Sequence, residues 1–155
     1  MQDSNLNYIA GDWVAGGSMI ENRNPSDLSD LIGMYAQATP DQLDATLDQA
    51  RRAQVEWEAY GIERKYNVLM AIGTEMMARA EELGTLLARE EGKPLAEGKG
   101  EIYRAGQFFT YYAAECLRQI GDTADSVRAG VEIDVRREPV GVVAVISPWN
   151  FPTAT

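Results

Sequence analysis

Histidine is absent from the 155-residue sequence, and cysteine occurs once, as Cys116. Without histidine, neither Ser-His-Asp nor Cys-His catalysis is available within this chain, and most zinc sites are excluded, so we predict no metal site. A single cysteine excludes an internal disulfide framework and is typical of the reducing cytoplasm. Cys116 falls on the apolar face of a predicted helix, where a buried, unreactive thiol is expected.

Basic residues are also scarce: 14 Lys and Arg stand against 24 Asp and Glu, which gives a net charge of −10. This balance disfavours binding to nucleic acid or to an anionic membrane surface. The sequence has no apolar run of transmembrane length, and its start, "MQDSNLNYIAGDW", lacks the basic and then apolar pattern of a signal peptide. We therefore expect a cytoplasmic protein without nucleic-acid or membrane partners.

The first part of the chain has the pattern of short strands and turns. "YIAGDWV" followed by "AGGS" predicts a hairpin in which Gly16 and Gly17 supply positive φ. Residues 24–30, "NPSDLSD", are turn-forming, and residues 31–36 are consistent with one more short strand.

Four helices are predicted next. The first begins with Thr39 as N-cap, Pro40 at the first helical position and Gln42 three residues after the cap. A second helix follows Gly61, and a third ends at Gly92 and Pro94. The fourth spans residues 95–120 and ends at Gly121. We expect the four helices to form a bundle.

After Gly130 the period of the apolar residues becomes two. Residues 131–135 alternate between apolar and charged side chains, which predicts a half-exposed antiparallel strand. Residues 140–146, "VGVVAVI", are apolar without alternation, as in a parallel strand covered on both faces. One strand cannot form a parallel sheet, so we expect its partners to lie outside this chain, which would then be a fragment.

The segment "SPWNFP" follows that predicted strand. Pro148 and Pro152 fix φ at two points, and loops at the carboxyl ends of parallel strands are where open α/β sheets bind ligands. The Asn150 amide could donate to a developing oxyanion, while Trp149 and Phe151 offer flat or apolar walls. From these residues alone, a rigid turn that buries two core aromatics is the favoured interpretation.

Several stretches resemble, in the same order, the N-terminal region of the aldehyde dehydrogenase superfamily: "YIAGDWV", "EEGKPLAEGKGEI", "YYAAE" and "REPVGVVAVISPWNFP". The resemblance implies an α/β fold with short N-terminal strands, four helices, part of the oligomerisation β-structure and the first strand of a Rossmann-like parallel sheet. It divides the chain into residues 1–120 (strands and helices of the cofactor-binding domain), 121–139 (oligomerisation β-structure) and 140–155 (first parallel strand and PWNFP loop, incomplete).

The resemblance also implies roles for individual residues. Asn150 corresponds to the catalytic asparagine that helps to form the oxyanion hole. The segment implied to lie along the nicotinamide half of NAD or NADP consists of Ile146, Ser147, Pro148 and Trp149. The residues implied to face the aldehyde are Phe151, Arg104, Phe108 and Tyr111.

The implied activity is NAD(P)-dependent oxidation of an aldehyde to a carboxylate by a homo-oligomer, a dimer or a tetramer. The family's nucleophilic cysteine and general-base glutamate correspond to positions beyond residue 155, and Cys116 matches no nucleophile motif, so the chain alone is expected to be inactive. "ADSVRAGVEIDVRREPVGVV" is similar to enzymes of α-ketoglutarate semialdehyde or succinate semialdehyde. Arg104 is then either the cation for such a carboxylate or an exposed helix arginine.

Two other functions remain open at this point. The chain could be a truncated remnant that acts only in subunit association. Without the resemblance, it could be an acidic helical binding module.

Overall fold

The computed structural model describes residues 6–118 and 120–154. In this part of the chain, the strands form three separate two-stranded antiparallel sheets and are accompanied by four helices. The strands are β1 (Asn7–Ile9), β2 (Asp12–Val14), β3 (Ser18–Arg23), β4 (Leu31–Gln37), β5 (Asp122–Asp125) and β6 (Glu132–Val135). The helices are α1 (Pro40–Ala59), α2 (Gly61–Ala78), α3 (Ala80–Glu91) and α4 (Leu95–Cys116).

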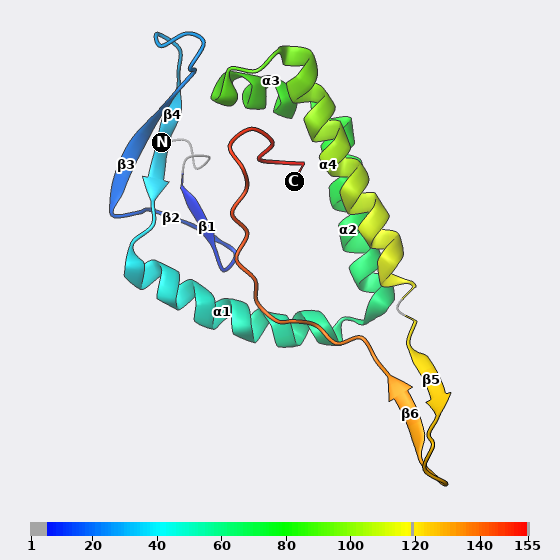
Figure 1. Cartoon of the computed structure of the whole chain (residues 1–155). Coiled ribbons are helices and arrows are strands. Elements are labelled where there is room, and N and C mark those ends of the chain that lie inside the picture. Colours follow the sequence, from blue (N-terminus) through cyan, green and yellow to red (C-terminus); the bar gives the residue numbers. More distant parts are fainter. Residues whose placement is uncertain (1–5, 119, 155) are drawn as a thin grey trace.

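The elements form an open frame around the last segment of the chain (Figure 1). Strands β1–β4 stand on one side, α2, α3 and α4 stand on the other, and α1 runs across between them. The segment after β6 passes along α1 and then turns into the middle of the frame. None of the helices in the described ranges is both long and apolar enough to cross a membrane.

The first hairpin turns at Ala10 and Gly11, whose φ angles are 54° and 96°. Two consecutive positive φ values are those of the tight turns that suit a two-residue hairpin. The prediction that Gly16 and Gly17 make this turn is therefore wrong. Gly16 is instead needed for a close approach, because a Cβ there would lie 2.0 Å from the Gln37 carbonyl oxygen.

The second hairpin pairs β3 with β4, from Ser18 opposite Gln37 to Arg23 opposite Leu31. Its connection is closed by the Asn24 N–H, which donates to the Asp30 carbonyl at 3.1 Å. The predicted turn and the strand after it are confirmed, with the strand one residue longer than expected.

Helix α1 begins as predicted. The Gln42 N–H donates to Thr39 Oγ1 at 3.2 Å, and the Thr39 N–H donates to Gln42 Oε1 at 2.9 Å, which completes a capping box. However, no residue of α1 is buried, and the helix packs extensively against no other helix or strand that the structure describes. The predicted four-helix bundle is therefore wrong, because only α2, α3 and α4 pack together.

The packing of these three helices depends on glycine. A Cβ on Gly73 would lie 2.6 Å from the Gly106 carbonyl oxygen, so α2 and α4 touch backbone to backbone. Gly84 of α3 and Gly98 of α4 make the same kind of contact, at 2.5 Å from a Gly98 Cβ to the Gly84 oxygen. Helix α3 ends, as predicted, at Gly92, which is left-handed with φ 72°. Helix α4 ends at Cys116 rather than at residue 120.

The third hairpin, β5–β6, projects away from the frame (Figure 1). The predicted strand after Gly130 is confirmed as β6, and its partner β5 runs from Asp122 to Asp125. Every residue of both strands is exposed, because the hairpin packs extensively against no other helix or strand in the described part of the chain.

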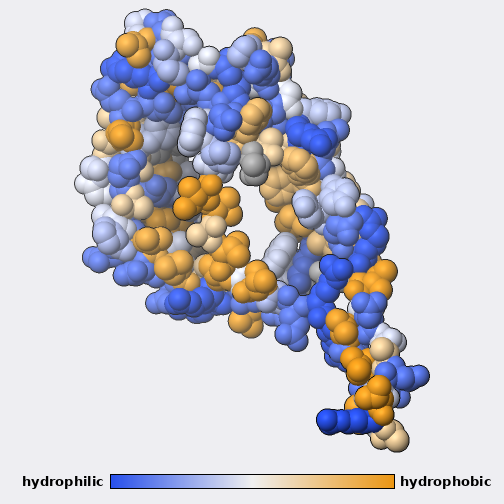
Figure 2. All heavy atoms as spheres, viewed as in Figure 1, coloured by the Kyte–Doolittle hydropathy of each residue, from blue (hydrophilic) through white to orange (hydrophobic). Residues whose placement is uncertain are grey.

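Residues 140–146 differ from their prediction. They are assigned to no strand, and no neighbouring strand pairs with them among the described residues. Their side chains are largely exposed, with Ile146 at 93%. Figure 2 shows apolar residues gathered along the inside of the frame, where this segment runs. A strand is defined by its ladder partner, so an apolar sequence alone did not suffice to form one here.

Candidate functional site

The last turns of the chain, residues 149–154, are attached to the helices by one buried carboxylate. Glu101 lies on α4 and is only 5% exposed. Its Oε1 accepts hydrogen bonds from the Thr153 N–H at 2.9 Å and from the Thr153 hydroxyl at 2.7 Å. Its Oε2 accepts a hydrogen bond from the Lys93 ammonium group. All three bonds have a charged partner, which makes them stronger than neutral hydrogen bonds.

Lys93 is the second attachment point and lies between α3 and α4. Besides Glu101, its Nζ contacts Glu91 Oε2 at 2.7 Å and donates to the Asn150 backbone carbonyl at 3.0 Å. The ammonium group also lies 4.8 Å from the centroid of the Phe151 ring, in a cation–π arrangement. One half-buried lysine thus touches two consecutive residues of the PWNFP loop.

These contacts decide the protonation states. Burial would raise the pKa of Glu101, but the hydrogen bonds from Lys93 and Thr153 outweigh it and bring the pKa below its ordinary value. Burial would likewise lower the pKa of Lys93, but Glu101 and Glu91 outweigh it and raise the pKa. Both groups are therefore charged at neutral pH, and the loop is held by an ion pair.

Asn150 lies at an open depression of about 400 Å³ beside this ion pair. The depression is lined by Glu91, Gly92, Lys93, Glu97, Trp149, Asn150 and Phe151. The Asn150 backbone is held, but its exposed side-chain amide makes no hydrogen bond to the described residues. The amide is therefore free to donate to a ligand.

The neighbours of Asn150 are also accessible. Trp149 is 90% exposed, and Ile146 and Ser147 are exposed, while Pro148 is half-buried. Phe151 is exposed as well, which contradicts the alternative that the PWNFP turn buries two core aromatics. The exposed indole and the isoleucine offer a flat and an apolar surface, and these suit a planar ring.

A second depression, of about 430 Å³, follows α4 beyond Thr153. Its lining consists of Ala105, Phe108, Phe109, Tyr112, Thr153 and Ala154. The structure therefore brings Phe108 to the C-terminal loop. The Arg104 guanidinium lies over the Phe108 ring at 4.8 Å and donates to Gln107 Oε1 at 3.3 Å. Tyr111 is outside the lining and packs edge-on against Tyr112 at 5.2 Å.

Sequence reasoning missed Glu101, Lys93 and Thr153. A signal for Glu101 was present: it occupies the helix face that also carries Gly98, Ile102 and Ala105, all of which are buried. A charged residue on a buried helix face requires a partner, and its position alone marks it for attention.

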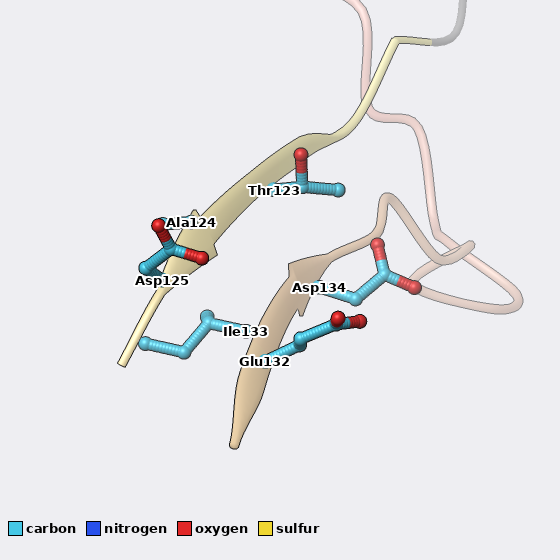
Figure 3. Close-up of a pocket in the computed structure, with 6 residues that line it drawn as sticks. All are labelled: Thr123, Ala124, Asp125, Glu132, Ile133 and Asp134. Carbon is cyan, nitrogen blue, oxygen red and sulfur yellow. The ribbon is translucent and has the colours of Figure 1, made fainter. Parts of the chain in front are cut away.

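Other candidate groups do not form a site. The face of the β5–β6 hairpin is a depression lined by Thr123, Ala124, Asp125, Glu132, Ile133 and Asp134 (Figure 3). Its carboxylates do not converge on a point, and within the described ranges no group of His, Cys, Asp or Glu residues could hold a metal ion. Cys116 is half-buried rather than buried, and its Sγ lies 3.5 Å from the Tyr112 carbonyl oxygen.

Comparisons with known proteins give a consistent result. Residues 13–155 match the model of a family described as the aldehyde dehydrogenase family. The chain is 36% identical to alpha-ketoglutaric semialdehyde dehydrogenase of Bacillus subtilis (strain 168), over 99% of this chain and 32% of that protein. It is also 36% identical to succinate-semialdehyde dehydrogenase (NADP(+)) GabD of Escherichia coli (strain K12), over 99% of this chain and 33% of that protein.

Solved structures agree with these relatives. An Escherichia coli NADP-dependent enzyme matches 97% of this chain and 31% of its own, with a TM-score of 0.92 and 36% identity. Succinate-semialdehyde dehydrogenase from Burkholderia pseudomallei matches 97% of this chain and 32% of its own, with a TM-score of 0.90 and 33% identity. The chain spans about a third of the length of the curated relatives it matches.

Proposed function

We propose that this chain, which belongs to the aldehyde dehydrogenase family, supplies the oxyanion-stabilising amide and part of the cofactor and aldehyde surfaces of an NAD(P)-dependent aldehyde dehydrogenase. The family predicted from the sequence is confirmed, as is the predicted α/β arrangement of short strands and four helices. The chain spans about a third of the length of its relatives, so we propose for it one part of the active site of a larger enzyme.

The proposal rests on how Asn150 is held, with a fixed backbone and a side-chain amide that is unpartnered among the described residues. Its backbone carbonyl is held by Lys93, the loop is fixed three residues later by Glu101, and its side-chain amide has no hydrogen-bond partner in the described part of the chain. A preorganised N–H donor stabilises the negative charge that develops on the carbonyl oxygen of an aldehyde under nucleophilic attack. We therefore propose Asn150 as the catalytic residue of this chain.

For the cofactor, we propose NAD or NADP along Ile146, Ser147, Pro148 and Trp149. The segment is accessible, and its indole and aliphatic surfaces fit a flat ring. Matched structures include 3,6-anhydro-L-galactose dehydrogenase in complex with NAP and an NAD-dependent benzaldehyde dehydrogenase from Corynebacterium glutamicum. A bound nicotinamide would accept the hydride of the aldehyde. Residues 146–149 would hold it in place and exclude water from one face.

For the substrate, we propose an aldehyde beside Phe151 and Phe108, and a semialdehyde acid in particular. The names of the relatives support this, since they include alpha-ketoglutaric, succinate and glutarate semialdehyde dehydrogenases. Phe108 lines the depression beside Thr153, and Arg104 stacks on its ring. Arg104 would attract a carboxylate, and Tyr111, farther along α4, would complete the wall.

A chimera tests the catalytic role. Residues 13–155 would replace the matched region of the Bacillus subtilis relative, and turnover of α-ketoglutarate semialdehyde would be measured. Asn150→Ala should lower kcat by about 10²- to 10³-fold, as for loss of one oxyanion-hole donor. Asn67→Ala, which changes an exposed asparagine of α2, is the control and should leave kcat unchanged. Equal activity of the two variants would contradict the proposal.

By itself the chain should not oxidise aldehydes, because it provides a stabilising amide but no activated nucleophile. Cys116 is half-buried on α4, and no histidine exists to activate it. Incubating the purified 155-residue chain with NAD(P) and an aldehyde should give no reduced nicotinamide. Turnover that disappears with Cys116→Ser would contradict this expectation.

Subunit association is a second role, proposed for the β5–β6 hairpin. It projects from the frame and exposes Val131, Ile133 and Val135, and an isolated two-stranded hairpin is marginally stable in water. Docking on another subunit would cover these side chains, in a homodimer or homotetramer. We further propose a cytoplasmic location, which the single unpaired cysteine supports.

A further inference from the structure

We propose that Glu101 and Lys93 are positioning residues that fix the Asn150 loop against helix α4, so that the Asn150 amide points in one direction before substrate binds. The consequence for catalysis rests on the proposed function. The attachment itself does not, because it concerns contacts within this chain alone.

The attachment is narrow. Apart from those of Phe151, the hydrogen bonds that join residues 139–154 to the helices or to the α3–α4 connection in the described part of the chain all involve Glu101 or Lys93. One of them ends on the Asn150 carbonyl and the other two on Thr153, so they bracket the turn that carries the amide. Removing either group would release one side of the turn.

The attachment is also buried at its base. The Glu101 side chain is 1% exposed and that of Lys93 is 11% exposed, unlike the ion pairs on the helix surfaces. The Lys99–Glu81 pair joins the same two helices at 2.6 Å, but Glu81 is exposed and touches no residue of the loop. A buried charge must be fully hydrogen-bonded, and Glu101 meets this condition only by binding Thr153 and Lys93.

Fixing the turn matters because Asn150 is otherwise exposed. Its side chain has no described partner to orient it, so the direction of the amide depends on the backbone at residue 150. A displacement of about 1 Å in a catalytic group can cost 10²-fold in rate. Lys93 acts on this backbone directly, and Glu101 acts through Lys93 and through Thr153.

The first experiment measures amide hydrogen exchange by NMR in the 155-residue chain. In Glu101→Ala, the Thr153 N–H loses its acceptor and should exchange about 10- to 100-fold faster. Glu101→Gln keeps an acceptor oxygen and should show a smaller increase. Glu81→Gln is the matched control, since it neutralises a glutamate of α3 that pairs with a lysine of α4 but does not contact the loop, and it should leave the exchange of the Thr153 N–H unchanged.

A fold check accompanies each variant. The amides of Ile102 and Ala105, buried on the same helix, should keep their protection. If Glu101→Ala disturbs them, Lys93→Met and Thr153→Val take its place, since each removes one of the hydrogen bonds to Glu101 and leaves its carboxylate with a partner. Unchanged exchange of the residue 153 N–H in the variants with an intact helical core would overturn the proposal.

The second experiment separates the attachment from the proposed function. In the chimera, Lys93→Met should lower kcat at least tenfold with a smaller change in KM, and Lys93→Arg, which keeps a donor for the Asn150 carbonyl, should restore most of kcat. Faster Thr153 exchange together with unchanged kcat would support the attachment and contradict the oxyanion role of Asn150. Unchanged exchange with a lowered kcat would overturn the attachment.

Discussion

Helices α2–α4 carry many charged and polar residues, whereas the segment 140–146 is apolar throughout, yet only the helices are packed. Helix α4 buries Ile102, Ala105 and Ala113 against its neighbours. Val145, by contrast, is 78% exposed, and residues 140–146 pair with no strand in the described part of the chain. Apolar character alone therefore does not decide which of the two regions packs.

The difference lies in where their backbone hydrogen bonds are made. A helix satisfies its N–H and C=O groups within one segment, so α2, α3 and α4 need only shape complementarity to pack. A strand satisfies them through a neighbour, and residues 140–146 have none in the described chain. The chain is nevertheless held just after this segment, where Glu101 and Lys93 bind the turn that contains the PWNFP residues.

The largest change in the free energy of unfolding is expected at the contact between α2 and α4. In Gly106→Ala, the new Cβ would lie 2.6 Å from Met77 Cγ and 2.7 Å from the Gly73 carbonyl oxygen. We expect this overpacking to lower the free energy of unfolding by about 1–3 kcal/mol. Urea denaturation followed by circular dichroism measures it.

Gly100→Ala is the control for that substitution. Gly100 lies on the same helix with nothing within 4 Å of the added Cβ. Alanine is the better helix former, so this variant should be more stable by about 0.5–1 kcal/mol. If both variants lower the free energy of unfolding equally, the loss in Gly106→Ala does not come from the close contact between α2 and α4.

A substitution in the exposed segment should have a much smaller effect. Val145→Asp places a charge where the structure has little packing, and the free energy of unfolding should change by less than about 0.5 kcal/mol. Light scattering should at the same time show less self-association, because an unpaired apolar segment is a site of aggregation. A loss above about 1 kcal/mol would show that Val145 is packed and would remove the contrast between the two regions.

The smallest effect is expected at the ion pair that joins the β3–β4 turn to α3. Arg89 binds both Asp30 oxygens, at 2.6 and 2.9 Å, and these hydrogen bonds, with that from Asn24, lower the Asp30 pKa from 3.8 to about 2. The pair therefore contributes stability above pH 3.8 that is lost as the pH falls toward 2. In Asp30→Asn, the midpoint of thermal unfolding should fall less steeply across this window. If the unfolding midpoint of Asp30→Asn falls as steeply with pH as that of the parent chain, this stability does not come from the Arg89–Asp30 pair.

Prediction from sequence succeeded where the determinants are local. Thr39 and Gln42 predicted the start of α1, and Gly92 predicted the end of α3, because caps depend on a few adjacent residues. It failed at Gly16, whose close contact with Gln37 depends on a strand pairing across 21 positions, and at α1, whose apolar stripe packs extensively against no other helix or strand that the structure describes. The partner of Glu101 could not be identified for the same reason, since Thr153 lies 52 residues away.

The sequence by itself determined the family, the helices and the identity of the PWNFP residues, because these follow from adjacent residues and from their order along the chain. Only the tertiary structure decided which helices pack together, that residues 140–146 stay unpaired within the described chain, and that Lys93 and Glu101 hold the loop of Asn150. Contacts between distant residues depend on the path of the backbone between them, and no local pattern encodes that path.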